Sequence, residues 1–531
     1  METENRVNIV EKATASVLDS VLGFVIFLVS LAAFYLPFEI RIIPEVARVL
    51  PIVRYVCAGI LLVSFFFLYG STLTVFRRNW ALWAAAGFTG VLIFSTVMNG
   101  GDLESALGTS GLAGLFLVMD IAVFFRVNPK KYLLTAFFFL LAINIANTCT
   151  VYEYCIKRGT GMWDVYGIST NWFFSLVGNY NGGIEYILPM AICGSAYAHR
   201  YGKWLDIFNY AGMIMSLIMA IKVDSLTQVV VFAALLVFMV IGNVAMLSDG
   251  FAKVLKVVFQ PVIFVAVDFA ILVSVVIINQ SNWVARLGID PDFHNRRHVW
   301  NMSMEWIAQK PIWGSGQETI TVEASKITGY AHSHCTYLEA AYKTGFVGCV
   351  FLLLLLAAAV VAIYRNRHGR LSYILTGQLF LFGLAAVAET YPMVYVMLCL
   401  GLIYYIAKNT NETKEAGKRM RKVRPDPGPA SGNSRAPGGG VKPGETTVSG
   451  NSPVPGNEGK PGNIPASGNI PTPGNSPAPV QSALDIQEEQ LEQVGQKVQE
   501  VQENQLSEFV SGDDIDQTVH IDETVLMKGG R

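Results

Sequence analysis

The chain has 531 residues, of which 52% are hydrophobic and only 15% are charged, and its mean hydropathy is +0.42. Soluble domains usually carry about 25% charged residues, so this composition excludes an ordinary soluble protein. The formal net charge of −1 gives no reason to expect an acidic partner such as nucleic acid. The seven cysteines show no Cys-x-x-Cys spacing, so neither a zinc site nor a disulfide framework is indicated.

Apolar segments that are long enough to cross a bilayer recur along residues 1–408. Because about 20 apolar residues in a helix suffice for one crossing, we predict an all-α fold, a polytopic bundle of about twelve transmembrane helices. No small-residue cleavage site follows the first segment before Pro37, so this segment is predicted to be a retained helix. The predicted spans are roughly 17–36, 50–70, 80–98, 106–125, 132–152, 182–198, 205–221, 226–246, 257–278, 336–363, 371–388 and 391–407.

Basic residues gather in alternate connections between these spans, which predicts the orientation of the chain. Short connections with an excess of Lys and Arg stay cytoplasmic. We therefore expect both termini inside the cell and the long hydrophilic connection 279–335 outside it. The basic positions are Arg6, Lys12, Arg77, Arg78, Arg126, Lys130, Lys131, Arg200, Lys203, Lys253, Lys256, Arg365, Arg367 and Arg370.

The composition changes abruptly after the membrane domain. Residues 409–482 are first basic and then rich in Pro, Gly and Asn, which predicts a disordered linker that either binds anionic headgroups or simply flanks the last helix. Apolar residues at helical spacing predict a short amphipathic helix over 483–510, followed by a tail over 511–531. Two or three heptads are only weak evidence for self-association or docking through residues 484–506.

The hydrophilic connection ends in three motifs, RRHVW, KPIWGSG and HSHCTYLEAAYKTGFVG. Trp300, Met304 and Ile307 share one face of a predicted helix, which would lie on the membrane surface or pack on the bundle. Pro311 ends this helix, and a Gly-x-Gly turn follows. His334 then stands at the mouth of the next membrane helix.

These motifs resemble the O-antigen ligase and polymerase superfamily of bacterial membrane glycosyltransferases. The family signature reads Arg, three residues, Trp, then about ten residues to Pro and Gly-x-Gly, and later His-Asn-x-x-Leu and Gly-x-x-Gly. The resemblance covers about residues 170–405. The matching residues are Arg296, Trp300, Pro311, Gly314, Gly316, His334, Leu338, Gly345 and Gly348, with Gly178 and Asn181 in an upstream Gly-x-x-Asn element.

Two positions depart from the family pattern. Cys335 stands where the family usually has Asn after the histidine. Leu226, in KVDSLTQ, stands where the family often has Arg, and Lys222 is predicted to supply the missing positive charge. The alternative is that Lys222 and Asp224 form a snorkelling pair at the interface.

The resemblance implies an enzyme that moves a glycan from a polyprenyl pyrophosphate carrier to an acceptor hydroxyl. The growing charge on the leaving pyrophosphate needs fixed cations or a metal. Asp290 and Asp292 are the nearest acidic residues. We favour a site without metal or cofactor, in which Arg296, aided by Arg297, binds pyrophosphate through its planar guanidinium. The alternative is that these arginines anchor the connection to lipid headgroups.

His334 is the predicted catalytic residue, because imidazole titrates near neutral pH and can accept the acceptor's proton. A lone histidine at a helix end is otherwise more often structural. His332 and Glu339 are secondary candidates, although Glu339 need not face the same way as His334. Acidic residues at membrane spans are weaker candidates, as are the histidines beside the arginines. These weaker candidates are Glu185, Asp268, Glu389, His294 and His298.

The resemblance thus implies a transferase of the bacterial inner membrane, with its active site facing outward, that builds cell-surface polysaccharide. Two other classes of protein remain as alternatives. A multi-pass transporter or polysaccharide flippase also has many helices. Transporters are often built from two related halves, but the first six and last six spans of this chain show no sequence similarity to each other. A scaffold or sensor would use the cytoplasmic tail. Within the transferase class, ligase and polymerase share the donor and differ in the acceptor, with a slight preference here for a polymerase.

Overall fold

The computed structural model describes residues 2–41, 43–69, 79–158, 174–244, 249–277, 296–319, 322–323, 326, 332–366 and 370–423. All of them belong to the first of two units, Met1–Ser431. Within this part of the chain the regular secondary structure is helical except for one antiparallel strand pair, β1 (Phe174–Ser175) and β2 (Gly178–Asn179). The all-α prediction is therefore confirmed for the described residues. The predicted linker, amphipathic helix and tail beyond 423 lie outside them.

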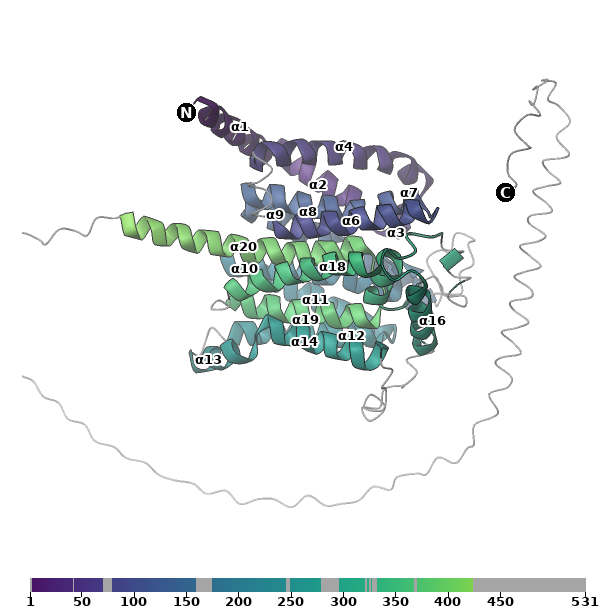
Figure 1. Cartoon of the computed structure of the whole chain (residues 1–531). Helices are drawn as coiled ribbons and strands as arrows, with labels where there is room; N and C mark the ends of the chain where they lie inside the picture. Colours follow the sequence, from purple (N-terminus) through teal and green to yellow (C-terminus); the bar gives the residue numbers. More distant parts are fainter. Residues whose placement is uncertain are drawn as a thin grey trace, which may run out of the picture. The chain divides into compact units, whose positions relative to one another are not determined.

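The helices pack against one another in a bundle (Figure 1). Three π-helical segments, η1 (Ala106–Ser110), η2 (Val151–Arg158) and η5 (Leu272–Ile277), and a 3-10 helix, η4 (Tyr180–Gly183), extend or join them. The α-helices are α1 (Glu2–Asp19), α2 (Val21–Tyr35), α3 (Phe38–Arg41), α4 (Pro44–Tyr69), α6 (Trp80–Met98), α7 (Leu103–Ser105), α8 (Leu112–Val127), α9 (Pro129–Thr150), α10 (Ile184–Arg200), α11 (Trp204–Lys222), α12 (Leu226–Val244), α13 (Asp249–Val258), α14 (Pro261–Ile271), α16 (Arg296–Gln309), α18 (Thr336–Arg365), α19 (Arg370–Ala388) and α20 (Met393–Val423).

Eight helices of the described residues are long and apolar enough to cross a membrane, or nine if α1 and α2, bent by 72°, form one span. Two shorter apolar helices, Pro261–Ile277 and Met393–Asn409, and the 17-residue α10 cover the remaining predicted intervals. Every predicted span therefore coincides with a helix, and the count of twelve crossings stays a prediction.

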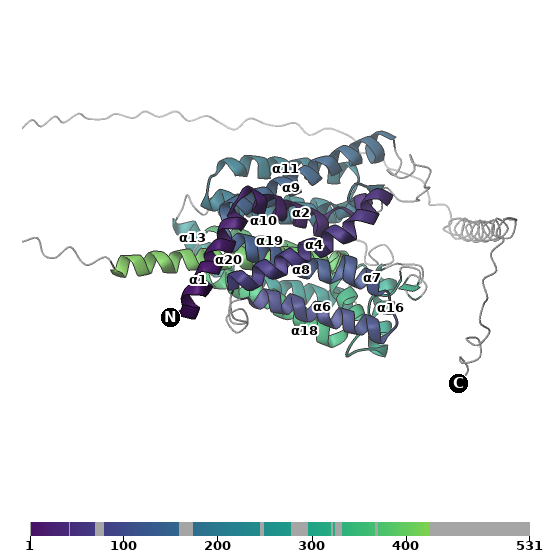
Figure 2. The same ribbon diagram turned by 90° about the horizontal axis from the view of Figure 1, so that it is seen from above.

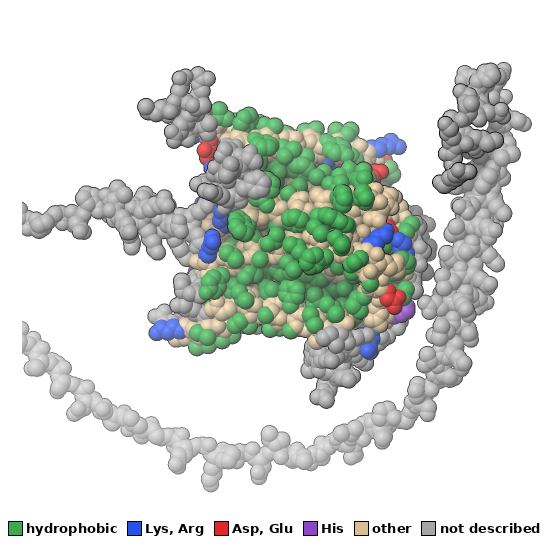
Figure 3. All heavy atoms as spheres, viewed as in Figure 1, with side chains coloured by type: hydrophobic (Ala, Val, Ile, Leu, Met, Phe, Trp, Pro, Cys, Tyr) green, Lys and Arg blue, Asp and Glu red, His purple; other side chains and the backbone are tan. Residues whose placement is uncertain are grey.

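The bundle has a buried centre and an apolar flank. Nearly every residue of α10 from Ile184 to Ala198 is buried, as expected for a helix that is apolar all round. By contrast, α4 exposes Ile52, Val56 and Phe66 on its outer side. Hydrophobic side chains cover the flank of the bundle, whereas charged side chains gather mostly at its ends (Figure 3). This distribution fits a protein whose side faces lipid.

Connections that were predicted to be cytoplasmic come together at one end of the bundle. Arg126, at the end of α8, pairs with Glu11 of α1. Arg200 donates to the carbonyl of Ile406 at 2.5 Å, which ties the end of α10 to α20. The opposite end carries α7 and α16 in both views (Figures 1 and 2). The two ends thus separate as the charge alternation predicts, while their assignment to sides of the membrane stays a prediction.

Candidate active site

The helix α16 is held on the bundle by its apolar face. Trp300 is only 2% exposed, and Met304 and Ile307 pack against the same cluster. The predicted Trp300, Met304 and Ile307 face is therefore confirmed, and it packs on the bundle. The buried members of this cluster are Leu272, Val275, Val276, Trp300, Cys335, Leu338 and Val387. As a result, the first residue of α16 lies beside the beginning of α18 and the end of α19.

Arg296 begins α16 and reaches the end of α19. Its Nη1 donates to the carbonyl of Ala388 at 2.5 Å, and its Nη2 donates to Glu389 Oε1 at 2.6 Å. The Glu389 carbonyl in turn accepts from the backbone N–H of Thr336 at 3.1 Å and from the Thr336 hydroxyl at 2.8 Å. The segment after α19 is thus fixed by the first residues of both α16 and α18.

His334 lies two residues before α18, on the other side of the Glu389 carboxylate. Its Nδ1 is 3.6 Å from Glu389 Oε2, and the side chains are 22% and 9% exposed. The backbone of His334 has φ +50°, a left-handed conformation that non-glycine residues adopt rarely and mainly where the surroundings enforce it. Glu389 therefore bridges the two ends of the predicted site, Arg296 and His334.

The surroundings of Glu389 favour its charged form. Burial opposes ionisation, but the nearby imidazole of His334 and the charge of Arg296 outweigh burial and hold the pKa of Glu389 below its usual range. A carboxylate with a fixed negative charge beside an imidazole can orient the ring and stabilise its protonated form. The arrangement has the elements of a base and its orienting group.

Glu339, in the first turn of α18, holds the segment that contains His332 and His334. Its Oε2 accepts from the backbone N–H of Ser333 at 3.0 Å, one residue before His334. Its Oε1 lies 2.7 Å from Lys343 Nζ, which is also 3.4 Å from Glu323 Oε1. The sequence did not require Glu339 and His334 to face the same way. In the structure the Glu339 carboxylate nevertheless contacts the segment that carries His334.

His332 lies against His334, with 4.3 Å between ring centroids and an interplanar angle of 68°. Burial, and next the charge of His334, lower the pKa of His332 to about 4, against the opposing influence of Glu339 and Glu389. His332 is therefore neutral near pH 7. Its Nδ1 is buried and has no hydrogen-bond partner within the described residues.

Cys335 stands where the family has Asn, and its thiol receives backbone hydrogen bonds from Tyr337 and Leu338. It precedes α18, and its side chain is fully buried in the Trp300 cluster. Burial raises the pKa of the thiol to about 11, so the thiol stays protonated. The carbonyl of Cys335 accepts from Ser333 Oγ at 2.8 Å. A buried thiol that packs in the Trp300 cluster and contacts the first turn of α18 therefore takes the place of the family's amide.

The motif glycines join the turn after α16 to a break in α18. Gly345 has φ +60° inside α18, where the helix is kinked. The backbone N–H of Phe346 donates to the Pro311 carbonyl at 2.7 Å, and that of Gly316 donates to the Lys343 carbonyl at 2.9 Å. A Cβ on Gly345 would lie 2.4 Å from the Ile312 carbonyl oxygen. The backbone of the turn after α16 and the backbone of α18 approach so closely here that there is no room for a side chain. This explains why the motif has glycine at these positions.

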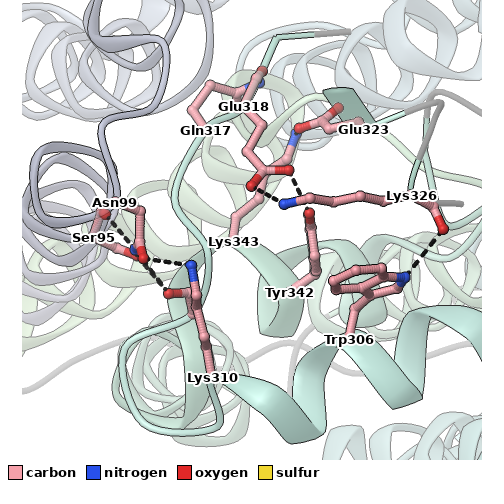
Figure 4. A network of polar contacts seen from close by, with 11 residues as sticks. Ser95, Asn99, Trp306, Lys310, Gln317, Glu318, Glu323, Lys326, Tyr342 and Lys343 are labelled. Carbon is pink, nitrogen blue, oxygen red and sulfur yellow. Dashed lines mark hydrogen bonds and ion pairs between the residues drawn. The ribbon is translucent and has the colours of Figure 1, made fainter. Parts of the chain in front are cut away.

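Polar side chains then attach this turn to α6 (Figure 4). Ser95 Oγ and Asn99 Nδ2 each donate to the Gly314 carbonyl at 3.1 Å, and Lys310 Nζ donates to Asn99 Oδ1 at 2.6 Å. The Tyr342 hydroxyl donates to Glu318 Oε2 at 2.6 Å. The turn that follows α16 is thus fixed at several points to α6 and α18.

The structure does not connect the remaining predicted residues to the Glu389 site through any described contact. Arg297 is half-buried in the first turn of α16, and His298 is exposed. Lys222 is the exposed last residue of α11, and within the described residues no hydrogen bond or ion pair joins it to Arg296 or His334. Gly178 lies in β2 and Asn181 in η4, directly before α10. His294, Asp290 and Asp292 fall outside the described residues.

Sequence reasoning gave too little weight to Glu389. It flagged this residue only as an acidic group near a membrane span. Arg296 and Glu389 are 93 positions apart in the chain, and no local spacing brings them together. One signal was available in the sequence. An acidic residue at the end of an apolar helix is energetically costly unless it has a partner, so a partner for Glu389 could have been sought.

One known family matches the part of the chain that contains Arg296 and His334. Residues 210–353 match the model of a family described as O-antigen ligase. The match runs from α11 into α18, so it includes Arg296, His334 and Glu339 and ends before Glu389. No curated protein matches the chain. The predicted resemblance to the O-antigen ligase superfamily is confirmed, over a shorter stretch than 170–405.

Proposed function

We propose that this chain is a membrane glycosyltransferase of the O-antigen ligase type. It would transfer a glycan from a polyprenyl pyrophosphate carrier to an acceptor hydroxyl, on the outer face of a bacterial inner membrane, in cell-surface polysaccharide assembly. The observation that carries this proposal is the contact of Arg296 and His334 with one carboxylate, Glu389. The family match to residues 210–353 supports the reaction class.

His334 is the proposed general base. In this role Nδ1 faces Glu389, and Nε2 accepts the proton of the acceptor hydroxyl. As that proton moves to Nε2, the acceptor oxygen bonds to the anomeric carbon of the donor, and the bond from this carbon to the pyrophosphate oxygen breaks. Glu389 offsets the positive charge that develops on the imidazole. The 3.6 Å separation is longer than a hydrogen bond, and we expect it to shorten when the ring is protonated.

Arg296 has two proposed tasks. Its contacts with Ala388 and Glu389 fix the carboxylate, and they leave further N–H donors on the same guanidinium. With its side chain 23% exposed, Arg296 remains accessible to a ligand. Together with Arg297 it would meet the negative charge on the leaving pyrophosphate. Lys222 stays a prediction that rests on the resemblance alone.

The reaction class is tested with purified protein in lipid nanodiscs. A polyprenyl pyrophosphate-linked oligosaccharide and an acceptor should give a glycosidic product and free polyprenyl pyrophosphate. If proteoliposomes take up a free solute and no transfer occurs, the transporter class replaces this proposal. Donor alone separates the two transferase types, since a polymerase forms longer lipid-linked chains without a second kind of acceptor.

A further inference from the structure

A cavity of about 450 Å³ opens between α2, α4, α7, η1 and α8. This volume falls within the range of small-molecule sites, about 300–1,000 Å³. The cavity is separate from the histidine segment, but its rim is joined to the turn after α16, because Asp102 N–H donates to the Gln317 carbonyl at 2.6 Å. Both views place α7 at the same end of the bundle as α16 (Figures 1 and 2).

One guanidinium stands in the wall of this cavity with an unused donor. Arg54 Nε donates to the Ala33 carbonyl at 2.8 Å, whereas Nη2 is buried and has no hydrogen-bond partner within the described residues. A Cβ on Gly108, another lining residue, would lie 3.7 Å from Arg54 Nη1. A buried charged donor without an acceptor is costly. An acceptor oxygen from a ligand would remove that cost.

The other lining residues restrict what kind of ligand fits. Asp102 and Glu104 add negative charge, with Glu104 exposed and Asp102 half-buried. These carboxylates repel a ligand that carries only negative charge, but they attract a cationic group next to a phosphate. Phe34 and Phe116 provide apolar wall, and the neighbouring outer face of α4 exposes Ile52. The ligand should therefore be an amphiphile that arrives from the bilayer.

We propose that this cavity binds a zwitterionic phospholipid with a phosphoethanolamine headgroup. The lipid phosphate accepts from Arg54, and the ammonium lies against Asp102 and Glu104. Part of an acyl chain covers Phe34 and Phe116. This binding does not depend on the proposed transferase function, and either proposal can fail alone.

The test is native mass spectrometry of the full chain released from detergent, with equimolar phosphatidylethanolamine, phosphatidylglycerol and phosphatidylcholine. The wild-type protein should retain phosphatidylethanolamine in preference to the other two. Gly108→Leu places a side chain into the cavity and should abolish the adduct. Gly90→Leu is the matched control, because a Cβ there meets nothing within 4 Å, and it should retain the adduct.

Two further variants test the charges separately. Arg54→Gln should weaken the adduct about tenfold or more, because charge-assisted hydrogen bonds to the phosphate are lost. Asp102→Asn combined with Glu104→Gln should move the preference from phosphatidylethanolamine to phosphatidylglycerol. Asn at position 102 can still accept from the Ser105 N–H, as Asp102 does at 2.9 Å, so the local turn is retained.

Three results would overturn the proposal. The first is an equal phosphatidylethanolamine adduct in Gly108→Leu and wild-type protein. The second is wild-type protein that retains phosphatidylglycerol at least as well as phosphatidylethanolamine. The third is displacement of phosphatidylethanolamine by an equal concentration of polyprenyl phosphate, which would assign the cavity to a carrier lipid.

Discussion

Glu389→Gln is the substitution that separates catalysis from architecture at this site. The side chain keeps its shape and loses its charge, while the Glu389 carbonyl that accepts from Thr336 is unchanged. At 3.6 Å and an effective dielectric constant of about 20, a charge pair with His334 is worth about 4–5 kcal/mol. Because His334 is partly exposed, we expect a loss of about 2–4 kcal/mol, which is about 30- to 1,000-fold in kcat.

The assay is single-turnover glycan transfer, run beside thermal unfolding of the same protein. In Glu389→Gln the positive charge that develops on the imidazole during transfer has no counter-charge, so the transfer rate should fall while the unfolding temperature is kept. Glu305→Gln, on the exposed side of α16, is the matched control and should keep both the rate and the unfolding temperature. A wild-type rate in Glu389→Gln would refute the assignment. A reduced rate together with a clearly reduced unfolding temperature would make Glu389 a structural residue only.

Three further predictions address leaving-group binding, the helix break and pH. Arg296→Lys keeps the charge but loses the fork that holds Ala388 and Glu389, so kcat should fall about 100-fold in the transfer assay, and a wild-type kcat would refute a role for the guanidinium. Gly345→Ala should lower the free energy of unfolding by about 1–3 kcal/mol, and with it the thermal unfolding temperature, because φ is +60° and a Cβ would meet the Ile312 carbonyl. Gly90→Ala should leave the unfolding temperature unchanged. Burial raises the pKa of Glu323 to about 7, so the folded chain binds this proton more tightly than the unfolded chain and stability falls as pH rises from about 4.5 to about 7. Glu323→Gln should therefore be more stable than wild-type protein at pH 8 in detergent melts and equal to it near pH 4, and a constant difference across this range would contradict the assignment.

The sequence allowed the helices and their buried faces to be predicted, because both depend on local patterns. Apolar runs located the helices, and the spacing of Trp300, Met304 and Ile307 identified the face by which α16 packs. The Gly-x-Gly turn was also predicted, although its reason was not. Its glycines allow close contact with the kink at Gly345, which depends on a segment about thirty residues further along the chain.

The centre of the site depends on contacts that no local pattern encodes. Glu389 follows a different helix from Arg296 and His334, and only the packing of α16, α18 and α19 brings the three together. Lys222 was inferred from the position of an absent arginine, and the structure gives it no described link to His334. Sequence spacing identified the residue types that the chemistry needs, but not the carboxylate between them.

The most direct measurement of the central claim is product analysis with His334→Ala and His298→Ala proteins that are expressed equally. His298 is exposed on α16 and serves as the matched histidine. Wild-type and His298→Ala proteins should form glycosidic product and free polyprenyl pyrophosphate in equal amounts, and His334→Ala should form neither above background. Product from His334→Ala at the wild-type rate would contradict the account.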